Sequence, residues 1–113
     1  MTKEGKKLVF VSVPMANLDD AIIKRRIQIT KAWYLKLTEQ NVKDVVFYDN
    51  YHGCLGMHFP DLKNERLGYL SRAILKLGEC DEAIFAKDWE SARGCKVEKM
   101  VCELYGIKCY FKD

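Results

Sequence analysis

The chain has 113 residues, of which 49% are hydrophobic and 31% carry a charge, and its formal net charge is +3. This length indicates one domain spanning residues 1–113, with enough apolar residues for one core. The basic residues are spread along the chain and no apolar run is long enough for a membrane span, so we expect neither a nucleic acid polymer nor a membrane as a partner.

Four short apolar segments have the length and the β-branched or aromatic content of strands. The first is almost wholly apolar, which is typical of a strand covered on both faces in a parallel sheet. The four strands are expected at Leu8–Val13, Val42–Tyr48, Ala83–Ala86 and Ile107–Phe111.

Helical patterns fill the intervals between these segments. A long helix is expected from Leu18 to about Gln40, with Asn17 or Asp19 as its cap and Asn41 as its stop. The second helix starts at Asp61 or Asn64 and ends at Gly78, and the third runs from Gly94 to Gly106. A polar loop of twelve residues, 49–60, precedes the second helix, and we expect it to cover a ligand or form an interface.

Strands that alternate with helices predict an α/β domain with a parallel sheet and right-handed crossovers. We expect a flavodoxin-like or Rossmann-like sheet of about four strands in the order 2-1-3-4, whose switch point lies between the first and third strands. Three loops would then meet at one crevice. Their polar and aromatic candidates for binding a ligand are Ser12, Pro14, Met15, Asn17, Asp49, Trp89, Ser91, Arg93 and Gly94.

Two sequence motifs lie in these loops. The first is Ser-x-Pro-Met from Ser12, followed by the long helix, and the second is Asp-Trp-Glu-x-x-Arg-Gly-x-x-x-Glu from Asp88 to Glu98. Together they resemble a small uncharacterised bacterial and phage family that is related to the nucleoside 2-deoxyribosyltransferases and the deoxynucleoside monophosphate N-glycosidases. The resemblance covers most of the chain. It is strongest from Asp81 to Gly106 and weak from Asn50 to Pro60.

The resemblance implies a nucleoside or nucleotide N-glycosidase or deoxyribosyltransferase. Gly94 and Gly106 flank Glu98 at the spacing that the family shows around its nucleophilic Glu, and Asp81 matches its strand-end Asp. We expect the helix dipole to keep Glu98 ionised. The family's further catalytic Asp would fall at position 73, which is Ala73 here, so Asp88 is the candidate acid.

The resemblance also implies a small-molecule partner and a homodimer or a higher homo-oligomer. Ser12, Asn17, Ser91 and Arg93 would contact phosphate or ribose, and Trp89 would stack on a base. We expect no cofactor, because the chain has no P-loop and no G-x-G-x-x-G after the first strand.

Other interpretations of the same residues stay open. Ala73 favours a non-catalytic protein that binds or sequesters a nucleotide on the same fold. A structural protein without a small ligand is a third interpretation, in which Glu98 makes a salt bridge on an exposed surface. Trp89 would then be a loop anchor or a subunit contact, and Arg93 a surface charge.

Five cysteines, an odd number without a C-x-x-C pair, indicate a reducing cytoplasm rather than a disulfide framework. The first residues lack the apolar region of a signal peptide, so we expect none. His52, Cys54 and His58 lie close together in the chain, but their spacing is not typical of a zinc site, so we expect no metal.

Overall fold

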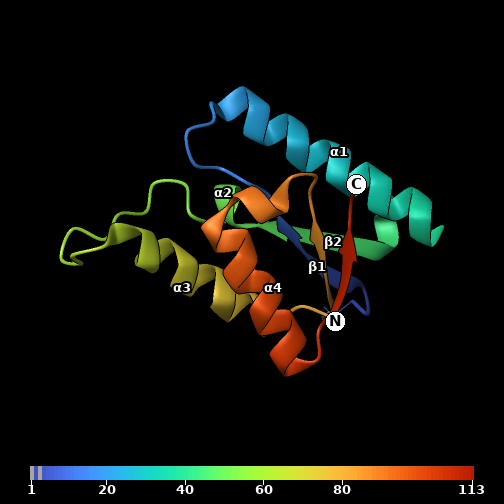
Figure 1. Cartoon of the computed structure of the whole chain (residues 1–113). Coiled ribbons are helices and arrows are strands. Elements are labelled where there is room, and N and C mark those ends of the chain that lie inside the picture. Colours follow the sequence, from blue (N-terminus) through green and yellow to red (C-terminus); the bar gives the residue numbers. More distant parts are fainter. Residues whose placement is uncertain (1, 3) are drawn as a thin grey trace.

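The structure is a computed structural model that describes residue 2 and residues 4–113. In this part of the chain, four parallel strands form one sheet in the order β2-β1-β3-β4, as the sequence predicts (Figure 1). The strands are β1 (Lys7–Ser12), β2 (Val45–Asp49), β3 (Glu82–Phe85) and β4 (Lys108–Phe111).

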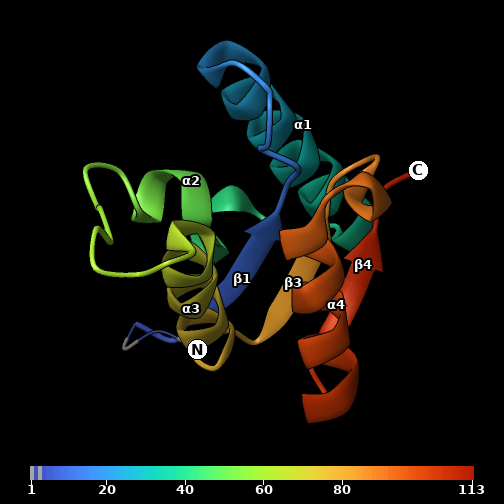
Figure 2. The same cartoon turned by 60° about the vertical axis from the view of Figure 1, so that its left-hand side comes forward.

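Helices cover both faces of this sheet. One face carries α1, and the other carries α3 and α4 (Figures 1 and 2). The helices are α1 (Asp20–Thr38), α2 (Asn50–Gly53), α3 (Glu65–Leu77) and α4 (Arg93–Tyr105), with short 3-10 turns η1 (Val42–Asp44) and η2 (Trp89–Ser91). The chain therefore folds as an α/β domain.

The central strand β1 shows why both faces are apolar. Successive side chains of a strand point to opposite faces. Val9 and Val11 belong to the core cluster under α1, while Phe10 between them belongs to the cluster under α3 and α4, and all three are buried. This arrangement confirms that the continuous apolar run marks a strand buried on both sides.

Side-chain caps shift the element boundaries from those expected. Asp19, one of the two expected caps, accepts a hydrogen bond from the backbone N–H of Ile22 and starts α1. Asn41, which was expected to end this helix, instead starts the 3-10 turn η1 and delays β2 to Val45. Asp49 accepts from the backbone N–H of His52 and starts the short helix α2 inside the segment expected to be a loop.

Polar side chains fasten the amino-terminal edge of the sheet. Oδ2 of Asp81 accepts a hydrogen bond of 2.8 Å from the backbone N–H of Leu8, which holds β3 beside β1. The hydroxyl of the buried Tyr34 donates to Oε1 of Glu82, and Nζ of Lys7 lies 3.4 Å from Oε2 of the same carboxylate. Asp81 therefore lies at the end of β3 opposite to the loops that were expected to meet.

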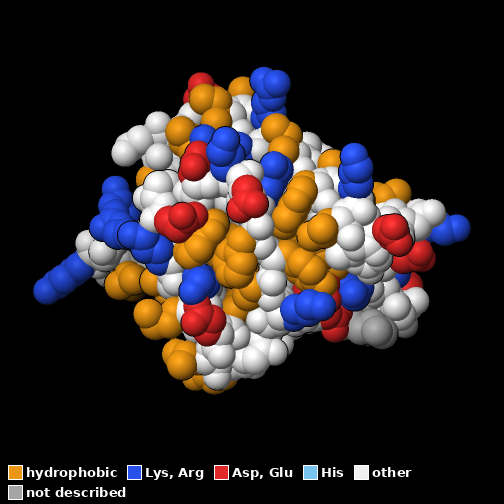
Figure 3. Space-filling model, turned by 45° about the vertical axis from the view of Figure 1, so that its right-hand side comes forward, with side chains coloured by type: hydrophobic (Ala, Val, Ile, Leu, Met, Phe, Trp, Pro, Cys, Tyr) orange, Lys and Arg blue, Asp and Glu red, His pale blue; other side chains and the backbone are white. Residues whose placement is uncertain are grey.

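The surface mixes charged and hydrophobic side chains. Figure 3 shows hydrophobic side chains gathered in the middle of one face, with Lys, Arg, Asp and Glu around them. On α4 the side chains of Met100, Leu104 and Tyr105 are exposed. Within the described part of the chain, no helix combines the length and the hydropathy that crossing a membrane requires.

Candidate functional site

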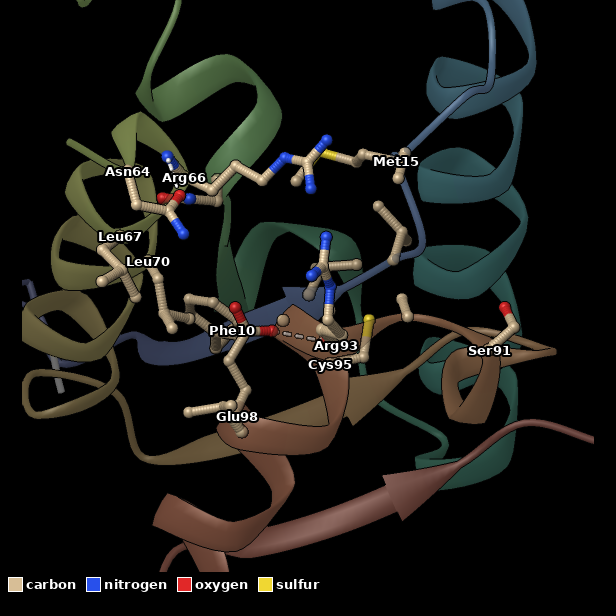
Figure 4. A pocket seen from close by; sticks show the side chains of 18 residues that line it. Phe10, Met15, Asn64, Arg66, Leu67, Leu70, Ser91, Arg93, Cys95 and Glu98 are labelled. Atoms are coloured by element: carbon tan, nitrogen blue, oxygen red, sulfur yellow. Dashed lines mark hydrogen bonds between the residues drawn. The ribbon is translucent and has the colours of Figure 1, made fainter. Parts of the chain in front are cut away.

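A cavity of about 540 Å³ lies where the carboxyl ends of the strands meet. The end of β1, the start of α2, the first turns of α3 and the segment from η2 into α4 each contribute side chains to its wall. We call it the Glu98 cavity; its lining includes Ser12, Met15, Asn50, Asn64, Arg66, Leu70, Ser91, Arg93, Cys95 and Glu98 (Figure 4). The expectation that three loops converge at the switch point is confirmed.

Glu98 lies on the buried face of α4. This face carries Cys95, Glu98 and Cys102 at positions i, i+3 and i+7, so a carboxylate is turned inward between two small apolar side chains. Glu98 is only 7% exposed, and its Oε1 accepts a hydrogen bond of 2.6 Å from Oγ of the buried Ser12. The interpretation in which Glu98 makes a salt bridge on an exposed surface is therefore wrong.

Burial raises the pKa of Glu98 to about 7, although the hydrogen bond from Ser12 acts in the opposite direction. This corrects the expectation that the helix dipole keeps the group ionised. Glu98 lies in the second turn of α4, and the field of the helix end falls off within the first turn. Burial also raises the pKa of the neighbouring Cys95 thiol to about 12, so this neighbour stays uncharged. Near pH 7 the Glu98 carboxyl is thus poised between its two protonation states.

Two arginines bring positive charge to the same cavity. Arg66 comes from the first turn of α3 and Arg93 from the first turn of α4, and both residues line the cavity (Figure 4). Both residues are exposed, and neither takes part in the ion pairs found among residues 2 and 4–113. Most of the remaining wall is apolar. The two guanidinium groups are therefore the groups of the wall that could pair with an anionic part of a ligand.

The sequence-predicted site residues divide into two groups. Ser12, Met15, Ser91, Arg93, Gly94 and Glu98 line the Glu98 cavity. The structure places Pro14, Asn17, Asp49, Asp88 and Trp89 outside its lining. Asp49 is buried and caps α2, where its Oδ2 lies 2.8 Å from Nδ1 of His52, and Asn17 has a left-handed backbone with φ of 62° before α1.

The candidate acid Asp88 is not brought to Glu98. Its backbone is left-handed, with φ of 67°, and Asp88 lines a neighbouring cavity together with Pro14, Leu18 and Arg26. The carbonyl of Asp88 accepts hydrogen bonds from the backbone N–H and the hydroxyl of Ser91, which fixes the turn in this conformation. The loop therefore directs Asp88 toward α1.

Trp89 packs over the edge of the sheet. Its ring centroid lies 5.7 Å from that of Phe85 and 5.2 Å from that of Phe111, and Nζ of Lys99 lies 5.7 Å from the Trp89 ring. These contacts hold the loop after β3 against β4. They support the interpretation of Trp89 as a loop anchor and leave no face of this side chain in the Glu98 cavity.

Ala73, at the position where the resemblance expects an acid, is fully buried in the core with Phe10 and Leu77. The side chains of α3 and its cap that line the cavity come from earlier positions, namely Asn64, Arg66, Leu67 and Leu70. Glu98 is thus the single carboxylate among the described residues that line the cavity.

Arg66 is the functional candidate that the motifs do not indicate. The available signal was topological: a helix that follows a parallel strand starts at the carboxyl edge of the sheet. The first turn of α3 therefore belongs to the same crevice as the loops. Within the described residues, no group of three or more His, Cys, Asp or Glu side chains is arranged to hold a metal ion.

The chain was also compared with known proteins. No family model, no curated protein and no solved structure matches it.

Proposed function

We propose that the Glu98 cavity binds a nucleoside or nucleotide and that Glu98 acts on its N-glycosidic bond. One observation carries this proposal: a buried carboxylate, bonded to Ser12, lies in a largely apolar cavity whose wall also includes Arg66 and Arg93, which form no ion pair among the described residues. Cleavage of a glycosidic bond passes through an oxocarbenium-like state, which a carboxylate at the sugar stabilises or captures covalently.

Four of the lining residues take part in the proposed reaction. The ionised Glu98 attacks the anomeric carbon of the sugar, a carbon–oxygen bond forms, and the bond to the base nitrogen breaks. The base leaves with the electron pair and takes a proton from water. A second water, or another base, then displaces Glu98 and gives hydrolysis or transfer. Arg66 and Arg93 bind the anionic part of the ligand, and Ser12 orients the carboxylate.

The test is release of free base from a 2′-deoxynucleoside 5′-monophosphate, followed by chromatography. We expect Glu98→Gln to lower the rate at least 100-fold, because the amide cannot form the covalent bond. The matched control is Glu103→Gln on the exposed part of the same helix, which should leave the rate unchanged. Full base release by Glu98→Gln would rule out this mechanism.

A second candidate function is binding or sequestration of a nucleotide without chemistry. It is favoured by the lack of a second carboxylate among the described residues of the cavity wall, because a departing base is usually protonated by a positioned acid. A rise in melting temperature with the nucleotide, without free base after long incubation, would select this function over catalysis.

A further inference from the structure

A second cavity, of about 510 Å³, adjoins the first. We call it the loop cavity. Glu98 lines both cavities, so it lies where the two meet. Six further residues also line both, namely Met15, Ala16, Asn50, Arg66, Leu70 and Gly94. The walls that belong to the loop cavity alone come from α2, from the segment that follows it and from α3, namely Tyr51, Cys54, Leu55, Gly56, Met57, His58 and Tyr69.

The segment that forms this wall is fastened to α3. The hydroxyl of Tyr69 donates a hydrogen bond of 2.9 Å to the carbonyl of Met57, and the backbone N–H of Phe59 donates one of 3.1 Å to Oε2 of Glu65. The Phe59 ring lies so close to Gly68 that a Cβ at Gly68 would come within 2.4 Å of it. In Figure 2 this segment extends from α2 to the start of α3. The wall is therefore built by specific contacts.

The two cavities differ in chemistry. Arg93 lines the Glu98 cavity and not the loop cavity, whereas Arg66 lines both, so the Glu98 cavity carries more positive charge. Two aromatic side chains, Tyr51 and Tyr69, together with Met57, line the loop cavity alone, and its wall is mostly apolar. The aromatic and apolar wall of the loop cavity can pack against a planar ring, while the arginines of the Glu98 cavity can bind a phosphate.

We propose that the loop cavity is the subsite for a planar base, and that the phosphate-bearing sugar of the same ligand occupies the Glu98 cavity. This inference rests on the proposed function. A ligand that spans both cavities places the bond between its base and its sugar at their junction, where Glu98 lies. The loop wall thus determines which bases the protein accepts.

The experiment compares two ligands by calorimetry, a 2′-deoxynucleoside 5′-monophosphate and 2-deoxyribose 5-phosphate, which lacks the base. Both are titrated into protein that carries Glu98→Gln, so that no ligand is consumed. We expect the nucleotide to bind at least tenfold more tightly than the sugar phosphate, because only the nucleotide fills the loop cavity.

Two variants then locate the extra affinity. Leu55→Ser removes an apolar side chain from the wall of the loop cavity. Gly68→Ala places a methyl group against the Phe59 ring and so displaces the segment before α3, although alanine has the higher helix propensity. Each variant should lower the affinity for the nucleotide at least threefold and leave the affinity for the sugar phosphate unchanged. Leu62→Ser is the control, since Leu62 is an exposed leucine of the same segment outside both cavities.

The outcomes separate the two proposals. Equal affinities for nucleotide and sugar phosphate would overturn the base subsite and leave the phosphate site standing. An equal loss in Leu62→Ser and Leu55→Ser would also overturn the subsite. Binding of neither ligand would overturn the proposed function and the subsite together.

Discussion

The hydroxyl of Ser12, in the last position of β1, donates a hydrogen bond of 2.6 Å to Oε1 of Glu98, a residue 86 positions later in the chain. Both residues are buried. The bond connects the central strand to α4 and is the contact that lowers the pKa of Glu98 against the effect of burial.

Removal of this bond should raise the pKa of Glu98 further. A hydrogen bond to a charged group is worth about 1.5–3 kcal/mol, so in Ser12→Ala we expect the Glu98 carboxyl to titrate above about pH 8. Carbon-13 NMR of the side-chain carboxyl measures this directly. Ser71→Ala on α3, whose hydroxyl donates a hydrogen bond to the Gly68 carbonyl, is the control. An unchanged titration in Ser12→Ala would show that the bond does not support the ionised form.

Burial of Glu98 should also make the stability depend on pH. Because its folded pKa is raised from 4.5 to about 7, the folded chain holds this proton more tightly than the unfolded chain. Its contribution is therefore complete below about pH 4.5 and is lost as the pH rises through about 7. This difference corresponds to about 3 kcal/mol as an upper limit.

Glu98→Gln removes that dependence. Urea unfolding of both proteins between pH 5 and pH 8 should show that the wild type loses stability relative to Glu98→Gln as the pH rises. Glu103→Gln should follow the wild type, since Glu103 is exposed. Parallel curves for wild type and Glu98→Gln would mean that Glu98 titrates at its ordinary pKa.

The two arginines of the cavity should bind the phosphate of a nucleotide. Arg66→Ala and Arg93→Ala should each weaken the binding of a nucleoside monophosphate about tenfold, which is the value of one charge-assisted contact. The affinity should fall with rising salt in the wild type and less so in the variants. Arg25→Ala, an exposed arginine on α1 and outside the cavity, is the control. Equal affinities in all four proteins would place the phosphate elsewhere.

Trp89 should contribute to stability and not to ligand affinity. Its ring packs against Phe85 and Phe111, so Trp89→Ala should lower the free energy of unfolding by about 2–3 kcal/mol. Calorimetric titration at a temperature where the variant stays folded should give the wild-type affinity for the nucleotide. A large loss of affinity would instead support a stacking role for this ring.

We expect at least a homodimer in solution, as the resemblance implies. Exposed hydrophobic side chains on α4, among them Leu104 and Tyr105, are candidates for the contact. Light scattering after gel filtration should give about twice the mass of the 13.1 kDa chain, and Leu104→Glu should reduce the mass. A monomer at every concentration would contradict this prediction.

The sequence predicted the sheet because its strands carry a strong signal. The continuous apolar run at Leu8–Val13 indicated a strand buried on both faces, and the alternation of strands and helices indicated a parallel sheet. The strand order followed from the flavodoxin-like pattern that such a sheet commonly adopts. The boundaries of helices and strands were less predictable where a polar side chain accepted a hydrogen bond from a backbone N–H. Asn41 and Asp49 started short helical turns inside segments expected to be strand or loop.

The site was only partly predictable. The spacing of residues along the sequence indicates which side chains share a helix face, but it does not indicate the direction in which a loop turns. Glu98 and Ser12 could be placed together from the topology. Asp88 and Trp89 could not, since the left-handed backbone at Asp88 and the aromatic contacts of Trp89 direct both side chains away from the cavity. The burial that raises the pKa of Glu98 was likewise a tertiary effect.

The central position of β1 has a consequence for synthesis on the ribosome. One edge of β1 pairs with β2, but its other edge pairs only with β3, whose residues 82–85 emerge much later. Until then an apolar strand with free backbone groups is open to pairing with other chains. The nascent protein is therefore most prone to aggregate during the interval in which α1, β2 and α3 already exist and β3 does not.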